Sequence, residues 1–232
     1  MTTYPKIETL FDRDDTFRVD TSRYRRPVYG TIDRWLVSEK VDGTNIRLVF
    51  EMDENPGGDG TEPPALTTAI KGKTDNASIP PLLLEHCRQL VSRLTADVGG
   101  LMLDRGLTQY VLYGEGYGPK IQNGGRYRTD QGFILFDIGV GGGRFLSDDV
   151  VTETAAKFAV PRVPLLYGGE PMPLADIVGM VQSGHASDVA DVYDPTFMAE
   201  GVVARTVEPL YDNRGERLMW KLKAKDFQAG RR

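Results

Sequence analysis

A lysine flanked by two carboxylates is the group in this sequence best suited to covalent chemistry. It is Lys40, in the run Glu-Lys-Val-Asp-Gly-Thr-Asn at residues 39–45, where a strand-like segment meets a glycine turn. A lysine amine in water loses its proton only near a pH of about 10.4. A nucleophilic lysine therefore needs a site that favours the neutral form by about 3 pH units, or about 4 kcal/mol. Desolvation, a neighbouring cation or a bound metal could supply this, but the same residues would also make a hairpin turn with a surface ion pair.

Four more segments place charged or aromatic side chains in or beside strands. Glu115 ends one strand-like segment, Phe-Ile-Leu-Phe-Asp at 133–137 is an apolar strand with two aromatic rings, and Glu200 precedes another strand. Lys221 and Lys223 point to the same side of a strand because side chains alternate with period 2. Such groups could converge on a nucleotide, with cations on phosphates, acids on Mg²⁺ and ribose, and a ring on the base. Taken singly, each has a simpler role in the core or on a solvated face.

The elements that must position these groups are mostly strands. Turn signals bound these strands, and apolar residues on one face together with capping residues predict a small number of helices between them. No repeat or linker is visible. The sequence therefore predicts a single α+β domain over residues 1–232, built around antiparallel sheets. The predicted strands are 35–39, 44–50, 65–71, 109–113, 132–138, 200–207 and 216–223, and the predicted helices are 80–98, 147–158 and 174–182, with a polar Gly/Pro loop at 53–64.

Composition excludes several classes of protein. The 232 residues include 26% charged residues, and no apolar run is long enough to cross a bilayer. The N-terminus lacks the pattern of a signal peptide, and the single Cys87 excludes an internal disulfide framework and a Cys-rich zinc site. We therefore expect a reduced, cytoplasmic location without a membrane partner. The net charge of −5 argues against a protein that is basic all over, although residues 18–26 and 214–232 are locally basic.

The order of these motifs resembles the covalent nucleotidyltransferase superfamily of ATP-dependent ligases and capping enzymes. The resemblance rests on Lys-x-Asp-Gly at Lys40, the strand-end Glu115, the aromatic strand 133–137, Glu-Gly-Val-Val at 200–203 and Lys-x-Lys at 221–223, and it spans roughly residues 35–225. It implies an adenylation domain of antiparallel sheets with flanking helices and ATP in the cleft between the sheets. Many relatives carry a carboxy-terminal OB domain. The sequence ends nine residues after Lys223, so we expect none here.

One position within the first motif favours RNA ligases. DNA ligases and capping enzymes typically carry Arg five residues after the lysine, whereas RNA ligases often carry Asn, and this residue is Asn45. The run Tyr-Gly-Glu-Gly-Tyr-Gly-Pro-Lys-Ile-Gln at 113–122 is also similar to RNA-ligase-family proteins. The resemblance therefore implies an ATP-dependent RNA ligase of the nick-sealing type, similar to enzymes of RNA repair and phage.

The resemblance also implies a role for each motif residue. Lys40 would form a covalent lysyl-AMP, and Lys221 and Lys223 would hold phosphates and stabilise the transition state. Glu200 would be the main group associated with Mg²⁺ or Mn²⁺, with Asp42 orienting the motif and supporting the metal. The implied nucleotide contacts are Glu39 to the adenine amino group, Asn45, Glu115 to the ribose, Phe136 stacked on adenine with Phe133 as the fallback, and Lys73 or Lys71 to phosphate, where the family usually has Arg.

The expected partner is RNA with 5′-phosphate and 3′-hydroxyl ends, with a nicked duplex favoured. Without a further domain, end joining could need an accessory protein. Three alternatives stay open at this stage: an ATP-dependent DNA ligase, a GTP-using capping enzyme, and an inactive nucleotide- or RNA-binding module on the same fold. Nucleotide choice, polynucleotide preference and covalent labelling separate them.

Overall fold

The computed structural model describes residues 3–15, 18–53 and 64–228. Most of the predicted Gly/Pro loop at 53–64 lies outside the described residues. The chain forms two compact units, each made of separate segments. The first unit comprises residues 1–4 and 43–162, and the second comprises residues 5–42 and 163–232. The α+β class is confirmed, and each unit is built around a five-stranded sheet.

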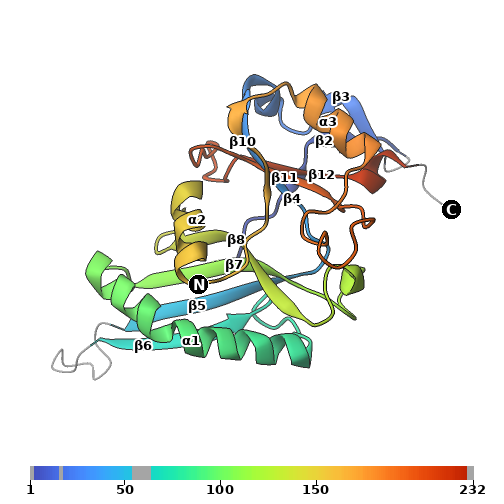
Figure 1. Cartoon of the computed structure of the whole chain (residues 1–232). Helices are drawn as coiled ribbons and strands as arrows, with labels where there is room; N and C mark the ends of the chain where they lie inside the picture. Colours follow the sequence, from blue (N-terminus) through green and yellow to red (C-terminus); the bar gives the residue numbers. More distant parts are fainter. Residues whose placement is uncertain (1–2, 16–17, 54–63, 229–232) are drawn as a thin grey trace. The chain divides into compact units, whose positions relative to one another are not determined.

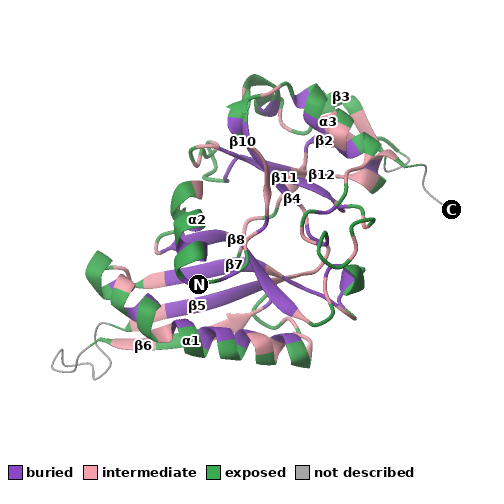
Figure 2. Cartoon of the chain, in the orientation of Figure 1, coloured by how far each residue is buried: buried purple, intermediate pink, exposed green. Residues whose placement is uncertain are grey.

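The sheet of the first unit is antiparallel throughout, with strand order β6-β5-β7-β8-β9. Its central strands are largely buried, as Figure 2 shows for β5, β7 and β8. The period-2 pattern of apolar residues predicted most of these strands, although β7 and β8 extend past the predicted ends. The strands are β5 (Thr44–Asp53), β6 (Ala65–Lys71), β7 (Gln109–Tyr117), β8 (Gly132–Val140) and β9 (Arg144–Phe145).

Two helices contribute to the core on one face of this sheet. They are α1 (Pro81–Arg105) and α2 (Asp148–Lys157), and their apolar residues pack with those of β5, β7 and β8. The predicted end of the first helix near Val98 is wrong, because the helix continues through two glycines to a left-handed C-cap at Gly106. Gly99 allows the helix to pack closely against β6, because a β-carbon at this position would lie only 3.0 Å from the Leu66 side chain.

The sheet of the second unit has strand order β1-β12-β11-β4-β10 (Figure 1). The predicted antiparallel pairing is found from β12 to β10, but at one edge β1 pairs with β12 in parallel. A two-stranded sheet of β2 and β3 and the helix α3 complete the unit, with short 3₁₀ helices. The elements are β1 (Glu8–Thr9), β2 (Phe11–Arg13), β3 (Val19–Tyr24), η1 (Pro27–Thr31), β4 (Arg34–Glu39), β10 (Leu165–Pro171), α3 (Leu174–Ser183), β11 (Gly201–Thr206), β12 (Met219–Lys223) and η3 (Ala224–Phe227).

The glycine turn after Lys40 does not form a hairpin. The strand before it, β4, belongs to the sheet of the second unit, and the strand after it, β5, belongs to the sheet of the first. Residues 41–43 therefore carry the chain from one sheet to another, which removes the simplest structural explanation of the motif. Among the described residues, no helix has the length and apolar character needed to cross a bilayer.

Candidate active site

Lys40, Glu200 and Lys223 form one ion-pair network in the second unit, which we call the Lys40 cluster. The Lys40 Nζ lies 2.6 Å from Glu200 Oε2, and the Lys223 Nζ pairs with Glu200 Oε1. The three side chains are 13% to 22% exposed, so they are shielded from water but still accessible. Two ammonium groups and one carboxylate give the cluster a net charge of +1. Three residues far apart in the sequence, each predicted as a site residue, therefore meet in one place.

Backbone pairing explains why these residues meet. The strand β11 lies between β4 and β12, with Gly201 opposite Lys223 and Val202 opposite Glu39. The Lys40 N–H donates to the Gly201 carbonyl at 2.9 Å, which places the nucleophile candidate beside Glu200. A β-carbon at Gly201 would lie 2.1 Å from the Leu222 carbonyl oxygen. The glycine of the Glu-Gly pair is thus required by the close approach of two backbones.

The electrostatics of Glu200 follow from this geometry. Burial alone raises the pKa of a carboxyl, but the ammonium groups of Lys40 and Lys223 outweigh this effect and lower the pKa of Glu200 below its ordinary value. Glu200 is therefore ionised at neutral pH. An ionised carboxylate between two cations offsets their mutual repulsion and holds both lysines in place, and it could ligate a metal ion only after an ammonium group has moved away from it.

Glu39 lies next to Lys40 but in different surroundings. It is 2% exposed, and its Oε1 accepts a hydrogen bond of 2.5 Å from the Ser187 hydroxyl. Its Oε2 accepts a bond of 3.2 Å from the Val189 backbone N–H. Burial raises the pKa of Glu39, although these hydrogen bonds oppose the effect. Sequence reasoning missed Ser187, because nothing in the pattern around it distinguishes it from any other loop serine.

The other two predicted site residues of the second unit are Lys221 and Asp42. Lys221 lies on β12 opposite Val203 and is half-buried, while its neighbours Trp220 and Leu222 are buried in the core. This alternation confirms that Lys221 and Lys223 share a side of the strand. Asp42 is half-buried in the segment after β4.

In the first unit, Asn45 of β5 lies opposite Glu115 of β7. The Asn45 Oδ1 is buried, and no described residue donates a hydrogen bond to it. A buried acceptor without a donor is costly in a folded protein, so this atom is suited to a donor on a bound molecule. A β-carbon at Gly43 would lie 2.3 Å from the Gly116 carbonyl oxygen, which explains the glycine of the Lys-x-Asp-Gly motif.

The two aromatic residues of β8 occupy different cores. Phe133 is fully buried in the cluster that contains α1, so its ring is a poor candidate for stacking on a base. Phe136 is partly buried and packs with the cluster of Val49 and Tyr113. The ring of Tyr4 meets that of Phe136 edge-on, with 4.9 Å between the centroids. Phe136 is therefore the better candidate of the two.

Lys73 is exposed and follows β6, and Lys71 is half-buried at the end of that strand. Arg47 of β5, which sequence reasoning missed, is fully buried beside them. Its Nε donates to the Gly72 carbonyl at 2.9 Å, and its Nη2 donates to Asp75 at 2.7 Å. Arg47 thus fixes the backbone on which Lys73 is carried.

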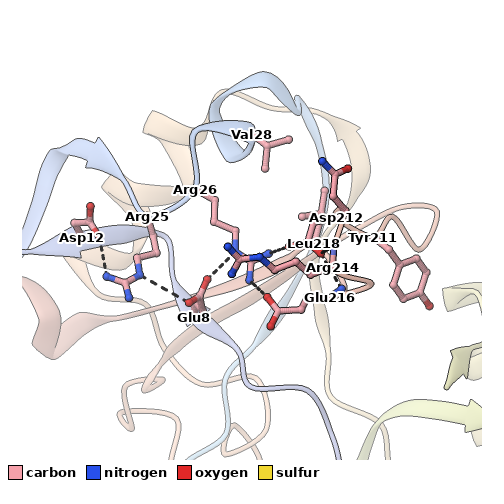
Figure 3. Close-up of a pocket in the computed structure, with 11 residues that line it drawn as sticks. Glu8, Asp12, Arg25, Arg26, Val28, Tyr211, Asp212, Arg214, Glu216 and Leu218 are labelled. Atoms are coloured by element: carbon pink, nitrogen blue, oxygen red, sulfur yellow. Dashed lines mark hydrogen bonds and ion pairs between the residues drawn. The ribbon is translucent and has the colours of Figure 1, made fainter.

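A separate cavity of about 790 Å³ in the second unit contains none of the predicted site residues (Figure 3). At its centre the Arg26 guanidinium pairs with Glu8 at 2.7 Å, with Asp212 at 2.9 Å and with Glu216. We call these four residues the Arg26 cluster. Its guanidinium donors are satisfied by the protein itself.

A metal ion at this site would need ligands from a substrate. Among the described residues, no group of three or more His, Cys, Asp or Glu side chains could hold a metal. A single carboxylate such as Glu200 fits Mg²⁺ or Mn²⁺ only together with phosphate oxygens and water, which is how Mg²⁺ is commonly bound in nucleotide sites.

Solved structures with a similar fold are RNA ligases from Naegleria gruberi. The structure with PPi matches with a TM-score of 0.61 and 17% identity, covering 97% of this chain and 62% of that one. A mutant with ATP and Mn matches with a TM-score of 0.57 and 16% identity, covering 97% and 62%. A mutant without ligand matches with a TM-score of 0.59 and 15% identity, covering 97% and 60%. The chain thus spans about three fifths of the length of these ligases, and the likeness shows a shared fold.

The family model described as RNA ligase matches residues 33–223. The matched region begins just before β4 and ends with Lys223, so it contains every residue of the Lys40 cluster and every motif discussed above. The chain belongs to the RNA ligase family.

Proposed function

We propose that this protein is an ATP-dependent RNA ligase that works through a covalent lysyl-AMP. The observation that carries the proposal is the Lys40 cluster, in which a lysine and a second cation share one carboxylate. Its net positive charge is suited to a triphosphate. The similar ligases of Naegleria gruberi were solved with ATP and Mn, with AMP and Mn, and with PPi, which supports ATP and a divalent metal as cofactors here.

In the first step, the Lys40 amine attacks the α-phosphorus of ATP. The N–P bond forms as the bond to the departing pyrophosphate breaks, and the proton that the attacking nitrogen loses passes to water. An ammonium paired with a carboxylate is not a nucleophile, so the contact between Lys40 and Glu200 must open first. Lys223, and Lys221 on the same side of β12, would neutralise charge on the phosphates as the leaving group departs.

In the second step, an oxygen of an RNA 5′-phosphate attacks the lysyl-AMP phosphorus, the N–P bond breaks, and the Lys40 amine is regenerated. In the third step, a 3′-hydroxyl attacks the activated 5′-phosphate, which forms the phosphodiester bond and releases AMP. A divalent metal held by Glu200 and phosphates, with Asp42 near the motif, would stabilise negative charge in these steps.

The residues of the first unit would bind the nucleoside. The buried Asn45 Oδ1 lacks a donor among the described residues, and a ribose hydroxyl could supply one. Glu115 opposite it would contact the ribose, Phe136 would stack on adenine, and Lys73 would contact phosphate. We propose that residues 1–232 act as one adenylation domain.

Covalent labelling tests the proposal. Purified protein is incubated with ATP or GTP labelled at the α-phosphate and with Mg²⁺ or Mn²⁺, then denatured. We expect label from ATP in the wild type and none in Lys40→Ala or Lys40→Arg, because arginine keeps the charge but cannot act as a nucleophile. Label from GTP instead would indicate a capping enzyme, and the absence of label in a folded protein would indicate a binding module.

A second assay tests the substrate. Nicked duplexes that differ only in having RNA or DNA at the 3′-hydroxyl side, and single-stranded RNA with a 5′-phosphate, are offered to the labelled enzyme. We expect the nicked RNA to be sealed fastest. Preferential sealing of DNA would make the protein a DNA ligase. Transfer of AMP to the 5′-phosphate without sealing would indicate that an accessory protein completes the reaction.

A further inference from the structure

The segment at residues 184–199, between α3 and β11 (Figure 1), is tied to the neighbouring residues Glu39 and Lys40 at two points. Glu39 binds the segment near its start through Ser187 and Val189. Lys40 binds Glu200, the residue that directly follows the segment, at 2.6 Å. Glu39, the last residue of β4, therefore contacts the segment near its start, and Lys40, the next residue, contacts the residue that follows the segment.

The hydrogen bond between Glu39 and Ser187 is buried, and the one between Glu39 and Val189 is partly buried. Glu39 and Ser187 are each 2% exposed. The Ser187 hydroxyl donates to Glu39 Oε1 at 2.5 Å and accepts from the Ala190 N–H at 3.1 Å, and the Val189 N–H donates to Glu39 Oε2 at 3.2 Å. We call these four residues the Glu39 anchor. Burial raises the pKa of Glu39, so these donors are needed to stabilise its charge.

Backbone hydrogen bonds join the two ends of the segment, so a displacement near its start would also displace its end. The Ser187 N–H donates to the Phe197 carbonyl at 2.8 Å, and the Ala199 N–H donates to the His185 carbonyl at 2.9 Å. These bonds join the residues of the Glu39 anchor to Ala199, the residue before Glu200. Release of Ser187 would therefore also loosen the backbone that carries the Glu200 carboxylate.

We propose that Glu39 is a positioning residue, which fixes the segment 184–199 and through it the Glu200 carboxylate against Lys40, and that it does not read the nucleotide base. The proposal rests on the proposed function for its catalytic meaning. It differs from the expectation that Glu39 contacts the adenine amino group. Both oxygens of the carboxylate already accept hydrogen bonds from the protein, and the residue is almost completely buried.

Four variants separate the two roles: Ser187→Ala, Ser187→Thr, Glu39→Gln and, as a matched control, Ser183→Ala, which removes an exposed hydroxyl at the end of α3. For each, we would measure the rate of lysine labelling at saturating ATP, the KM for ATP, and the ratio of ATP to GTP labelling. Amide hydrogen exchange of residues 185–199 reports on the segment independently of activity.

We expect Ser187→Ala and Glu39→Gln to lower the labelling rate by about 10- to 100-fold, because small displacements of catalytic groups have effects of this order. The ATP to GTP ratio should stay unchanged, and amide exchange in 185–199 should accelerate. Ser187→Thr, which keeps the hydroxyl, should recover most of the rate. Ser183→Ala should match the wild type in every measurement. Should Ser187→Ala fail to fold, Glu39→Gln provides the same test.

Two results would overturn the proposal. If Glu39→Gln increases GTP use while Ser187→Ala keeps the wild-type rate, Glu39 reads the base. If both variants label at the wild-type rate with unchanged exchange, the anchor has no effect on Lys40. These failures are distinct from failure of the proposed function, in which the wild type itself would acquire no label.

Discussion

The Lys40 cluster and the Arg26 cluster are built from the same kinds of group in opposite proportions. In the Lys40 cluster two cations share one carboxylate, which gives a net charge of +1. In the Arg26 cluster one guanidinium pairs with three carboxylates, which gives these four residues a net charge of −2, and the neighbouring Arg25 also pairs with Glu8 at 3.8 Å. A surplus of positive charge attracts phosphate, whereas a cation satisfied by several carboxylates is suited to holding elements together. A cavity of about 790 Å³ surrounds the Arg26 cluster, yet charge favours the Lys40 cluster as the candidate nucleotide site.

The strongest test of this contrast is to remove the surplus cation. In Lys223→Ala, the Lys40 cluster loses its net positive charge, and we expect the rate of lysine labelling to fall by about 100-fold or more, as when a group that stabilises transition-state charge is removed. Lys225→Ala, which removes an exposed lysine two residues away, is the matched control and should label normally. Equal rates for both variants would contradict a phosphate-binding role for Lys223.

Substitution of Arg26 should lower the stability of the protein without changing the rate of lysine labelling. The Arg26 side chain is only 20% exposed, and Arg26→Ala removes the cation that three carboxylates share. We therefore expect a loss of about 2 kcal/mol in the free energy of unfolding. This corresponds to a decrease of about 5 °C in Tm. Below the new Tm, the labelling rate per folded molecule should equal that of the wild type. A lower labelling rate in a fully folded Arg26→Ala protein would contradict a purely stabilising role for the Arg26 cluster.

Lowering the pH should reduce the contribution of the Lys40 cluster to the stability of the protein. The pKa of Glu200 is lowered in the folded state by Lys40 and Lys223 despite its burial. The ion pairs therefore contribute stability above a pH of about 4.5, and this contribution is lost as the pH falls through the lower folded-state pKa. We expect the Tm of the wild type to exceed that of Glu200→Gln near neutral pH and the gap to narrow toward a pH of about 3. A gap that widens on acidification would show that the pKa of Glu200 is raised instead.

The smallest effect on stability should come from substitution of Glu216, the most exposed carboxylate of the Arg26 cluster. The Glu216 side chain is 55% exposed, so its pair with Arg26 is screened by water. We expect Glu216→Gln to change the free energy of unfolding by less than about 1 kcal/mol and to leave labelling unchanged. A larger loss, measured by urea denaturation, would mean that the three carboxylates do not act independently.

Local patterns predicted the strands that carry the motifs, because alternation and turn residues are visible within a few positions. The alternation of Lys221 and Lys223 with buried Trp220 and Leu222 is an example. Pairing between distant segments could not be predicted in this way. Neither the parallel pairing of β1 with β12 nor the placement of β4 and β5 in different sheets has a local signal.

The same limit applies to the candidate site. The family motifs identified Lys40, Glu200 and Lys223, whose meeting the structure then showed. Ser187 and Arg47 could not be found, because their importance lies only in what they bind, and a lone serine or arginine is typical of any surface.

The interleaved construction of the two units also constrains the order in which the protein can be made. Residues 43–162 form nearly all of the first unit as one continuous stretch and can condense while synthesis is still under way. The second unit cannot be completed until its later segments have been synthesised, because Glu8 pairs with Trp220 and both Lys40 and Lys223 pair with Glu200. Contacts between such distant positions form slowly, since a long loop must close before any of them is gained. A nascent chain on the ribosome therefore carries Lys40 before Glu200 and Lys223 have been made, and the Lys40 cluster can form only after residue 223 has emerged.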